Sequence, residues 1–154
     1  MGECRRTLQW KESGYVSYKN AFIRVSPDCP VDRAVVPEAG KKGKPIHMIQ
    51  YELLSQAPYR YNHEELIFEV HIRHKGISEE ELRERRQEIW DELFSKPHAC
   101  MRASALPKKY GWGVHYDEHG KIALYGVDSR EYREFCAAQD GRVKLLDGMR
   151  SSRK

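Results

Sequence analysis

The sequence predicts an α+β fold in which an antiparallel sheet has about three helices packed mainly on one of its faces. Two observations carry this prediction. Apolar and polar residues alternate at 66–74 and again in a β-hairpin at about 112–127, which is the period of a strand. Apolar residues recur with the period of a helix at 46–56, 78–95 and 129–139.

The composition is that of one globular domain. The 154 residues are 40% hydrophobic and 32% charged, with a net charge of +4. We expect the domain at 19–150, after a weakly ordered N-terminal extension at 1–18 and before a basic tail at 151–154. No apolar run has the length of a transmembrane helix or follows the start as in a signal peptide, so we expect no membrane association and a cytoplasmic location.

The four cysteines, Cys4, Cys29, Cys100 and Cys136, are scattered along the chain. No two of them form the C-x-x-C pair of a zinc ribbon or a thioredoxin-like motif. We therefore expect free thiols, no metal and no cofactor.

Prolines and a basic loop divide the first part of the domain. The segment NAFIRVSPDCPV at 20–31 favours a short strand that its prolines end, because proline cannot donate to a ladder. The longest predicted loop is 32–45, which contains the basic cluster GKKGKP. The helix at 46–56 follows and ends before Pro58.

The strand predicted at 66–74 has the sequence LIFEVHIRH. Its buried face would consist of Leu66, Phe68, Val70 and Ile72. Its opposite, largely polar face would consist of Ile67, Glu69, His71 and Arg73.

Capping residues mark the starts of the two later helices. Ser78 and Glu81 form a capping box for the helix at 78–95. Asp128 and Glu131 form the expected cap of the last helix. The residues of that helix expected to face inward are Tyr132, Phe135 and Cys136.

The sequence DEHG at 117–120 predicts a type I turn whose glycine takes the left-handed conformation, as in a G1-bulge hairpin. This turn fixes the register of the hairpin. Trp112 lies opposite Gly126, and Gly113 lies opposite Tyr125. Each glycine thus faces an aromatic ring that restores packing.

Trp112 has two interpretations. In the first, it covers Gly126 and packs into the core with Val114 and Leu124. In the second, its flanking glycines leave the ring open to a base or an anion, assisted by Lys108 and Lys109 just before it.

Known catalytic motifs are absent: the sequence has no H-E-x-x-H, no phosphate loop, no G-x-G-x-x-G and no G-x-S-x-G. His98 and Cys100 lack the third group that would orient a base. Arg102 and Ser104 are better candidates, because they could form an anion site beside the hairpin.

A polar cluster is expected if the strand at 66–74 and the hairpin share a sheet. Its members would be Glu69, His71, Arg73, His115 and Tyr125. A carboxylate, two imidazoles, a guanidinium and a phenol could bind a polar ligand or transfer a proton. The alternative is that this face is solvated or covered by a helix.

Five segments in order, FIRVSPDCPV, IQYELL, PYRYNHEELIFEVH, CMRASALPKKYGWGVHYDEHGKIALYG and EYREF, resemble a bacterial family of small proteins classed as a domain of unknown function. The most specific of them is MRASALPKKYGWGVH, and the resemblance covers about residues 20–150. The resemblance implies a bacterial, cytoplasmic protein. It implies no activity, cofactor or catalytic residue, because none is established for the family.

The function expected from these features is a non-enzymatic binding domain for a phosphate-bearing or other anionic partner, such as a nucleotide or a nucleic acid. The candidate ligand-binding residues are Arg102, Ser104, Lys108, Lys109, Trp112, His115, Tyr125, Glu69, His71 and Arg73. Two alternatives stay open. One is a small enzyme with a His/Glu/Arg site on the polar sheet face, and the other is a homo-oligomeric scaffold with Trp112 and Tyr125 at its interface.

Overall fold

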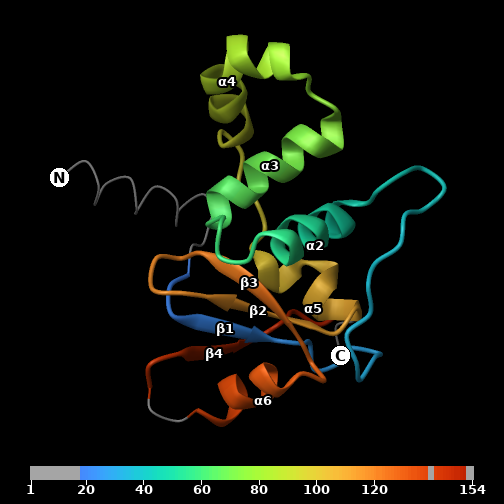
Figure 1. The fold of residues 1–154 in the computed structure, drawn as a ribbon, viewed down its shortest axis with the longest axis vertical. Coiled ribbons are helices and arrows are strands. Elements are labelled where there is room, and N and C mark those ends of the chain that lie inside the picture. Colours follow the sequence, from blue (N-terminus) through green and yellow to red (C-terminus); the bar gives the residue numbers. More distant parts are fainter. Residues whose placement is uncertain (1–17, 139–140, 152–154) are drawn as a thin grey trace.

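The structure, a computed structural model, describes residues 18–138 and 141–151 and has an α+β fold (Figure 1). Nearly all of the expected extension at 1–18 and tail at 151–154 lies outside the described residues. The elements in chain order are β1 (Ala21–Arg24), α2 (Ile46–Gln56), α3 (His63–Lys75), α4 (Glu79–Leu93), η1 (Met101–Ala103), α5 (Ala105–Lys109), β2 (Trp112–Tyr116), β3 (Ile122–Gly126), α6 (Arg130–Ala137) and β4 (Lys144–Asp147). None of the described helices is both long and apolar enough to span a membrane.

Four strands form a mixed sheet in the order β3-β2-β1-β4. β1 pairs antiparallel with β2, and β2 pairs antiparallel with β3, but β4 runs parallel to β1. The expectation of a purely antiparallel sheet is therefore wrong at the β4 edge. The chain crosses over through α6 from β3 at one edge of the sheet to β4 at the other edge, so that β4 runs in the same direction as β3 and β1.

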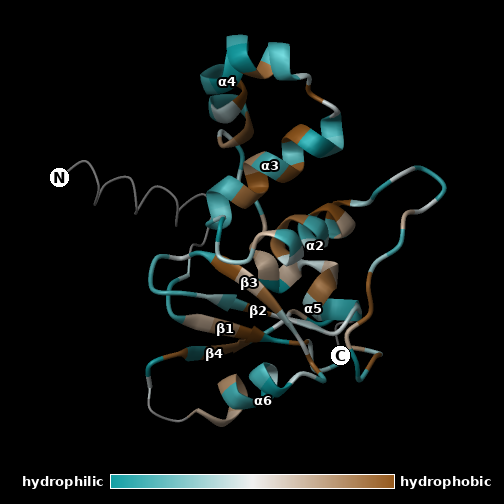
Figure 2. Ribbon diagram, viewed as in Figure 1, coloured by the Kyte–Doolittle hydropathy of each residue, from teal (hydrophilic) through white to brown (hydrophobic). Residues whose placement is uncertain are grey.

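Helices cover both faces of this sheet. On one face, α2, α3 and α5 enclose the main core, whose strand residues include Ile23, Val114 and Tyr116. On the other face, α6 packs the rings of Tyr132 and Phe135 against Phe22, with centroid distances of 5.1 and 4.6 Å. Figure 2 shows hydrophobic residues along β3 and α2 and a mostly hydrophilic α4.

The segment predicted as a strand at 66–74 is helical and belongs to α3. A complete capping box starts the helix: the Asn62 side chain accepts from Glu65 N at 2.8 Å, and Glu65 Oε1 accepts from Asn62 N at 2.9 Å. Gly76 ends it in the left-handed conformation, with φ 66°. These local signals override the alternating pattern.

The alternating apolar residues of α3 serve two separate clusters. Leu66 and Val70, four residues apart, face the main core over the sheet. Phe68 and Ile72, also four apart, face a second cluster with Ile89 of α4. Two helical stripes offset by two residues imitate the period of a strand, which explains the wrong prediction.

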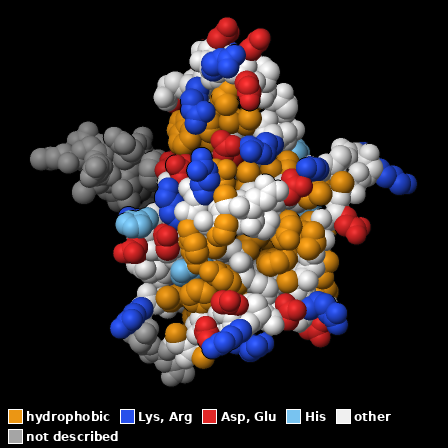
Figure 3. Space-filling view, viewed as in Figure 1, with side chains coloured by type: hydrophobic (Ala, Val, Ile, Leu, Met, Phe, Trp, Pro, Cys, Tyr) orange, Lys and Arg blue, Asp and Glu red, His pale blue; other side chains and the backbone are white. Residues whose placement is uncertain are grey.

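The helix predicted at 78–95 is confirmed as α4. Ser78 Oγ accepts from Glu81 N at 3.1 Å, and the Arg85 and Glu81 side chains form an ion pair at 2.8 Å. Its apolar side packs on α3 through Trp90, whose ring lies 4.9 Å from that of Phe68. Together α3 and α4 extend away from the sheet (Figure 1), and Figure 3 shows acidic and basic side chains side by side at the outer end of this arm.

The β2–β3 hairpin has the predicted register. Trp112 pairs with Gly126, and Gly113 pairs with Tyr125. Gly120 has the predicted left-handed φ of 78°, and its N–H donates to Asp117 O at 3.0 Å. The helix predicted at 46–56 also has the observed bounds of α2.

The cap of α6 differs from the prediction. Ser129, and not Asp128, is the N-cap, and its Oγ accepts from Tyr132 N at 3.1 Å. Asp128 Oδ1 instead accepts from Ala34 N at 3.2 Å and so fastens the loop before α2.

Candidate functional site

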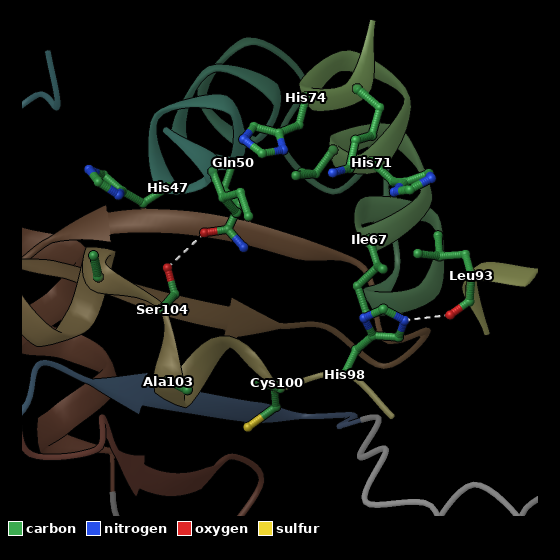
Figure 4. A pocket seen from close by; sticks show the side chains of 15 residues that line it. His47, Gln50, Ile67, His71, His74, Leu93, His98, Cys100, Ala103 and Ser104 are labelled. Atoms are coloured by element: carbon green, nitrogen blue, oxygen red, sulfur yellow. Dashed lines mark hydrogen bonds between the residues drawn. The ribbon is translucent and has the colours of Figure 1, made fainter. Parts of the chain in front are cut away.

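The candidate site is a cavity of about 480 Å³ between α2, α3 and the segment 98–105 (Figure 4). We call it the histidine pocket, because four of its fifteen lining residues are histidines. The lining residues are Ile46, His47, Gln50, Ile67, Val70, His71, His74, Lys75, Leu93, His98, Ala99, Cys100, Ala103, Ser104 and Ala105.

Local structure orients the polar groups of the pocket. Ser104 caps α5 by accepting from Leu106 N at 3.2 Å, and its own hydroxyl donates to Gln50 Oε1 at 2.7 Å. His71 and His74 are three residues apart on α3, so they share one side of the helix. α2 contributes His47, whose ring stacks on Tyr110 with centroids 4.8 Å apart.

His98 and Cys100 do not form a nucleophile and base. His98 Nε2 donates to Leu93 O at 2.6 Å, and Cys100 Sγ lies 3.8 Å from the hydroxyl of Tyr18. Figure 4 shows the sulfur pointing away from the imidazoles. Thiol catalysis would require a hydrogen bond between the two side chains.

Burial favours the neutral form of two imidazoles of the pocket, His47 and His71. Burial, assisted by Lys109, lowers the pKa of His47. Burial, assisted by Lys75, His98 and His74, lowers the pKa of His71. No carboxylate lines the pocket to oppose these shifts.

The imidazoles are spread around the pocket instead of meeting at a point (Figure 4). In agreement, residues 18–138 and 141–151 contain no group of three or more His, Cys, Asp or Glu side chains that could hold a metal ion. The arrangement can surround a ligand with hydrogen-bonding groups, but it does not form a coordination sphere.

Of the predicted site residues, the structure places His71 and Ser104 in the histidine pocket. Arg102 is used elsewhere, because its Nε donates to Asp147 O at 2.6 Å and so holds β4. The side chains of Glu69 and Arg73 bond to each other at 2.6 Å on α3. Ser104 therefore lines the histidine pocket, and Arg102 does not.

Trp112 follows the first of its two interpretations. Its ring packs against the main core, its Nε1 donates to Val35 O at 2.8 Å, and Tyr51 contacts it at 5.2 Å between centroids. The backbone beside the ring is covered, since a Cβ on Gly111 would lie 2.5 Å from Arg33 O. Lys108 and Lys109 lie in the last turn of α5.

His115 and Tyr125 share a sheet face as predicted, but α3 does not join them. Their partner is Tyr59, whose hydroxyl lies 2.9 Å from His115 Nδ1 and 2.7 Å from the Tyr125 hydroxyl. Phe135 of α6 stacks on His115 at 4.3 Å, so a helix covers this face. The predicted cluster with Glu69, His71 and Arg73 is wrong, because those residues belong to the helix on the opposite side of the sheet.

Sequence reasoning missed Tyr59 and most of the histidine pocket. Tyr59 has a left-handed backbone with φ 61°, which is uncommon for a bulky residue and has no marker in the sequence. His74 had a usable signal, since its spacing from His71 places both on one side of a helix. Assigning a strand to this segment pointed the two side chains in opposite directions.

The chain belongs to a protein family of unknown function, DUF6157, whose model matches residues 14–154. This match confirms the resemblance seen in the sequence. No curated protein and no solved structure matches the chain.

Proposed function

We propose that this member of the DUF6157 family is a binding domain whose histidine pocket takes a small organic anion with an apolar body. The observation that carries the proposal is the charge of the lining residues. Four imidazoles and Lys75 line the pocket, and no carboxylate does. Groups that donate hydrogen bonds or gain a proton surround a ligand there, which favours negative charge.

The size and the apolar wall support a small-molecule ligand. The volume of about 480 Å³ lies within the usual range of ligand pockets. Ile67 and Val70 of α3, with Leu93 at the end of α4, supply an apolar wall. A ligand that is only an inorganic ion would leave this wall unused.

The start of α2 adds positive potential at the pocket. Ile46 and His47, its first two residues, line the pocket, and the N-cap is Pro45. No side chain caps this helix, and its first turn holds no acidic residue. The partial positive charge of the helix N-terminus is therefore not offset by the protein and adds to the attraction of an anion.

The hydrogen bonds of the pocket favour binding over catalysis. The Ser104 hydroxyl donates to Gln50, and His98 donates to a backbone carbonyl. The Cys100 thiol contacts the Tyr18 hydroxyl, so the hydroxyl and the thiol that line the pocket both have partners other than an imidazole that could activate them.

The test compares two probes with the same chain, hexane-1-sulfonate and hexan-1-ol, by isothermal titration calorimetry. The sulfonate is fully ionised, so it reports the preference for charge. We expect it to bind about tenfold more tightly than the alcohol, and we expect H71Q/H74Q to remove this preference. His119, an exposed histidine in the hairpin turn, provides the control variant H119Q, which should bind as the native chain does. Equal affinity for the two probes would contradict the proposal.

A further inference from the structure

A second hollow adjoins the histidine pocket at His74. It has a volume of about 500 Å³ and is lined by Lys42, Lys44, Ile49, Glu52, Arg73 and His74. His74 lines both cavities, and its side chain lies between α2 and α3 in Figure 4. A ligand that extends past the His74 imidazole would therefore contact both cavities.

The second hollow is the place where the basic cluster GKKGKP meets α3. Gly40 and Gly43 exchange backbone hydrogen bonds of 2.9 and 3.1 Å, which closes a tight turn with Lys42 inside it. Gly43 has a φ of 102°, which favours glycine at that position. The turn brings Lys42 and Lys44 to the same hollow as Arg73 of α3. Two lysines of the loop and one arginine of a helix distant in the sequence thus lie at the same hollow.

The basic side chains of this hollow differ in whether an acidic side chain already pairs with them. Lys44 Nζ lies 3.0 Å from both carboxylate oxygens of Glu52, and Arg73 bonds to Glu69. Lys42 is exposed and makes no ion pair with any residue in the described part of the chain. It is therefore available to a ligand without breaking an existing contact.

We propose that the ligand is an organic diphosphate, an inference that rests on the binding function proposed above. Its apolar body occupies the histidine pocket, its first phosphate lies against His74, and its second phosphate lies beyond His74 against Lys42 and Lys44. Two anionic groups joined by one bridging atom fit two hollows that share one side chain. Phosphate oxygens accept several hydrogen bonds at once, and lysine ammonium groups bind them as point charges.

The helix geometry supports the same placement. Lys44 immediately precedes Pro45, the N-cap of α2, so the second phosphate would approach the end of α2 that carries partial positive charge. Two hollows of a few hundred cubic ångströms have the size that fits a small molecule.

The experiment measures the affinities of hexyl diphosphate, hexyl phosphate and hexane-1-sulfonate by calorimetry at constant ionic strength. We expect the diphosphate to bind about tenfold more tightly than the monophosphate. K42A should reduce diphosphate binding about fivefold and leave sulfonate binding unchanged, because Lys42 reaches only the second hollow. Lys41 lies in the same turn but does not line the hollow, so K41A is the matched control and should change neither affinity by more than about twofold.

The outcomes separate this inference from the proposed function. If the sulfonate binds and the diphosphate binds no better than the monophosphate, the diphosphate inference alone is overturned. An equal effect of K42A and K41A on diphosphate binding also overturns it, because the attraction would then be a general one of charge. If none of the three probes binds, the proposed function itself is wrong.

Discussion

Trp112 lies directly across the β-ladder from Gly126, and its Cζ3 is 3.9 Å from the position that a Cβ on this glycine would occupy. The ring therefore fills space beside the glycine without preventing a small side chain there. The closer neighbours of that position are the Ala34 Cβ at 2.8 Å and Asp128 Oδ1 at 3.0 Å. The loop before α2 thus packs on the hairpin, and Trp112 holds it with the hydrogen bond to Val35.

Gly113 offers a sharper test of the packing on the other face of the hairpin. A Cβ at this position would lie 2.6 Å from Phe22 Cζ and 2.7 Å from Tyr132 Cε2. We expect Gly113→Ala to lower the free energy of unfolding by about 2 kcal/mol, because rings packed between β1 and α6 would have to move. Urea unfolding measures this change.

Gly40→Ala is the control for that substitution. A Cβ on Gly40 would meet only one atom within 4 Å, Gly43 O at 3.9 Å. The substitution Gly40→Ala should therefore change the free energy of unfolding by less than about 0.5 kcal/mol. Equal effects of the two substitutions would show that α6 is not packed on the hairpin as described.

The hydroxyl of Tyr59 joins the loop after α2 to the covered face of the sheet. Tyr59→Phe keeps the ring and removes the hydrogen bonds to His115 and Tyr125, so it should destabilise the fold by about 1 to 2 kcal/mol. His115 and Tyr125, both half-buried, would each lose one hydrogen bond. Thermal unfolding provides the measurement.

Tyr61→Phe is the matched substitution two residues later. The Tyr61 ring packs against the main core, and its hydroxyl makes no hydrogen bond to any residue that the structure describes. We expect a change of less than about 0.5 kcal/mol. A loss as large as that of Tyr59→Phe would contradict the role given to the Tyr59 hydroxyl.

The elements predicted correctly are those that short-range chemistry determines. The hairpin register follows from one turn, Asp117 to Gly120, and α2 ends where Pro58 approaches. Each signal lies within a few residues of the structure it specifies. For the same reason the start of α4 could be recognised at Ser78.

The elements predicted wrongly depend on contacts between distant parts of the chain. The apolar residues of α3 alternate because Leu66 faces the sheet while Phe68 faces α4, and no local pattern distinguishes two such stripes from a strand. β4 exists because it pairs with β1, more than a hundred residues earlier in the chain. The histidine pocket depends in turn on α3, so the wrong strand concealed it.

His63 gives the stability of the fold a pH dependence. Burial, followed by repulsion from His98, lowers the pKa of His63 to about 4, against 6.5 for an unburied histidine. As pH falls from 6.5 toward 4, the unfolded chain gains a proton that the folded chain does not, so stability decreases. Between pH 7.5 and 5 this residue should reduce the free energy of unfolding by about 2 kcal/mol.

The variant His63→Gln isolates this contribution. Glutamine does not titrate, so the variant should lose about 2 kcal/mol less than the native chain between pH 7.5 and 5 in urea unfolding. If both chains respond to pH in the same way, the titration of His63 does not control the stability.

Ligand binding should depend on pH in the opposite direction, because the histidine pocket gains protons when an anion enters. In the free protein, burial lowers the pKa of His47 and His71, so both are mostly neutral at pH 7.5. A bound sulfonate stabilises the protonated imidazoles and raises their pKa values, so binding is coupled to proton uptake. The affinity for hexane-1-sulfonate, whose own charge is constant, should increase about fivefold from pH 7.5 to 6. H71Q should flatten this dependence while H119Q leaves it intact, and an affinity that falls with decreasing pH would exclude imidazoles as the groups that bind the anion.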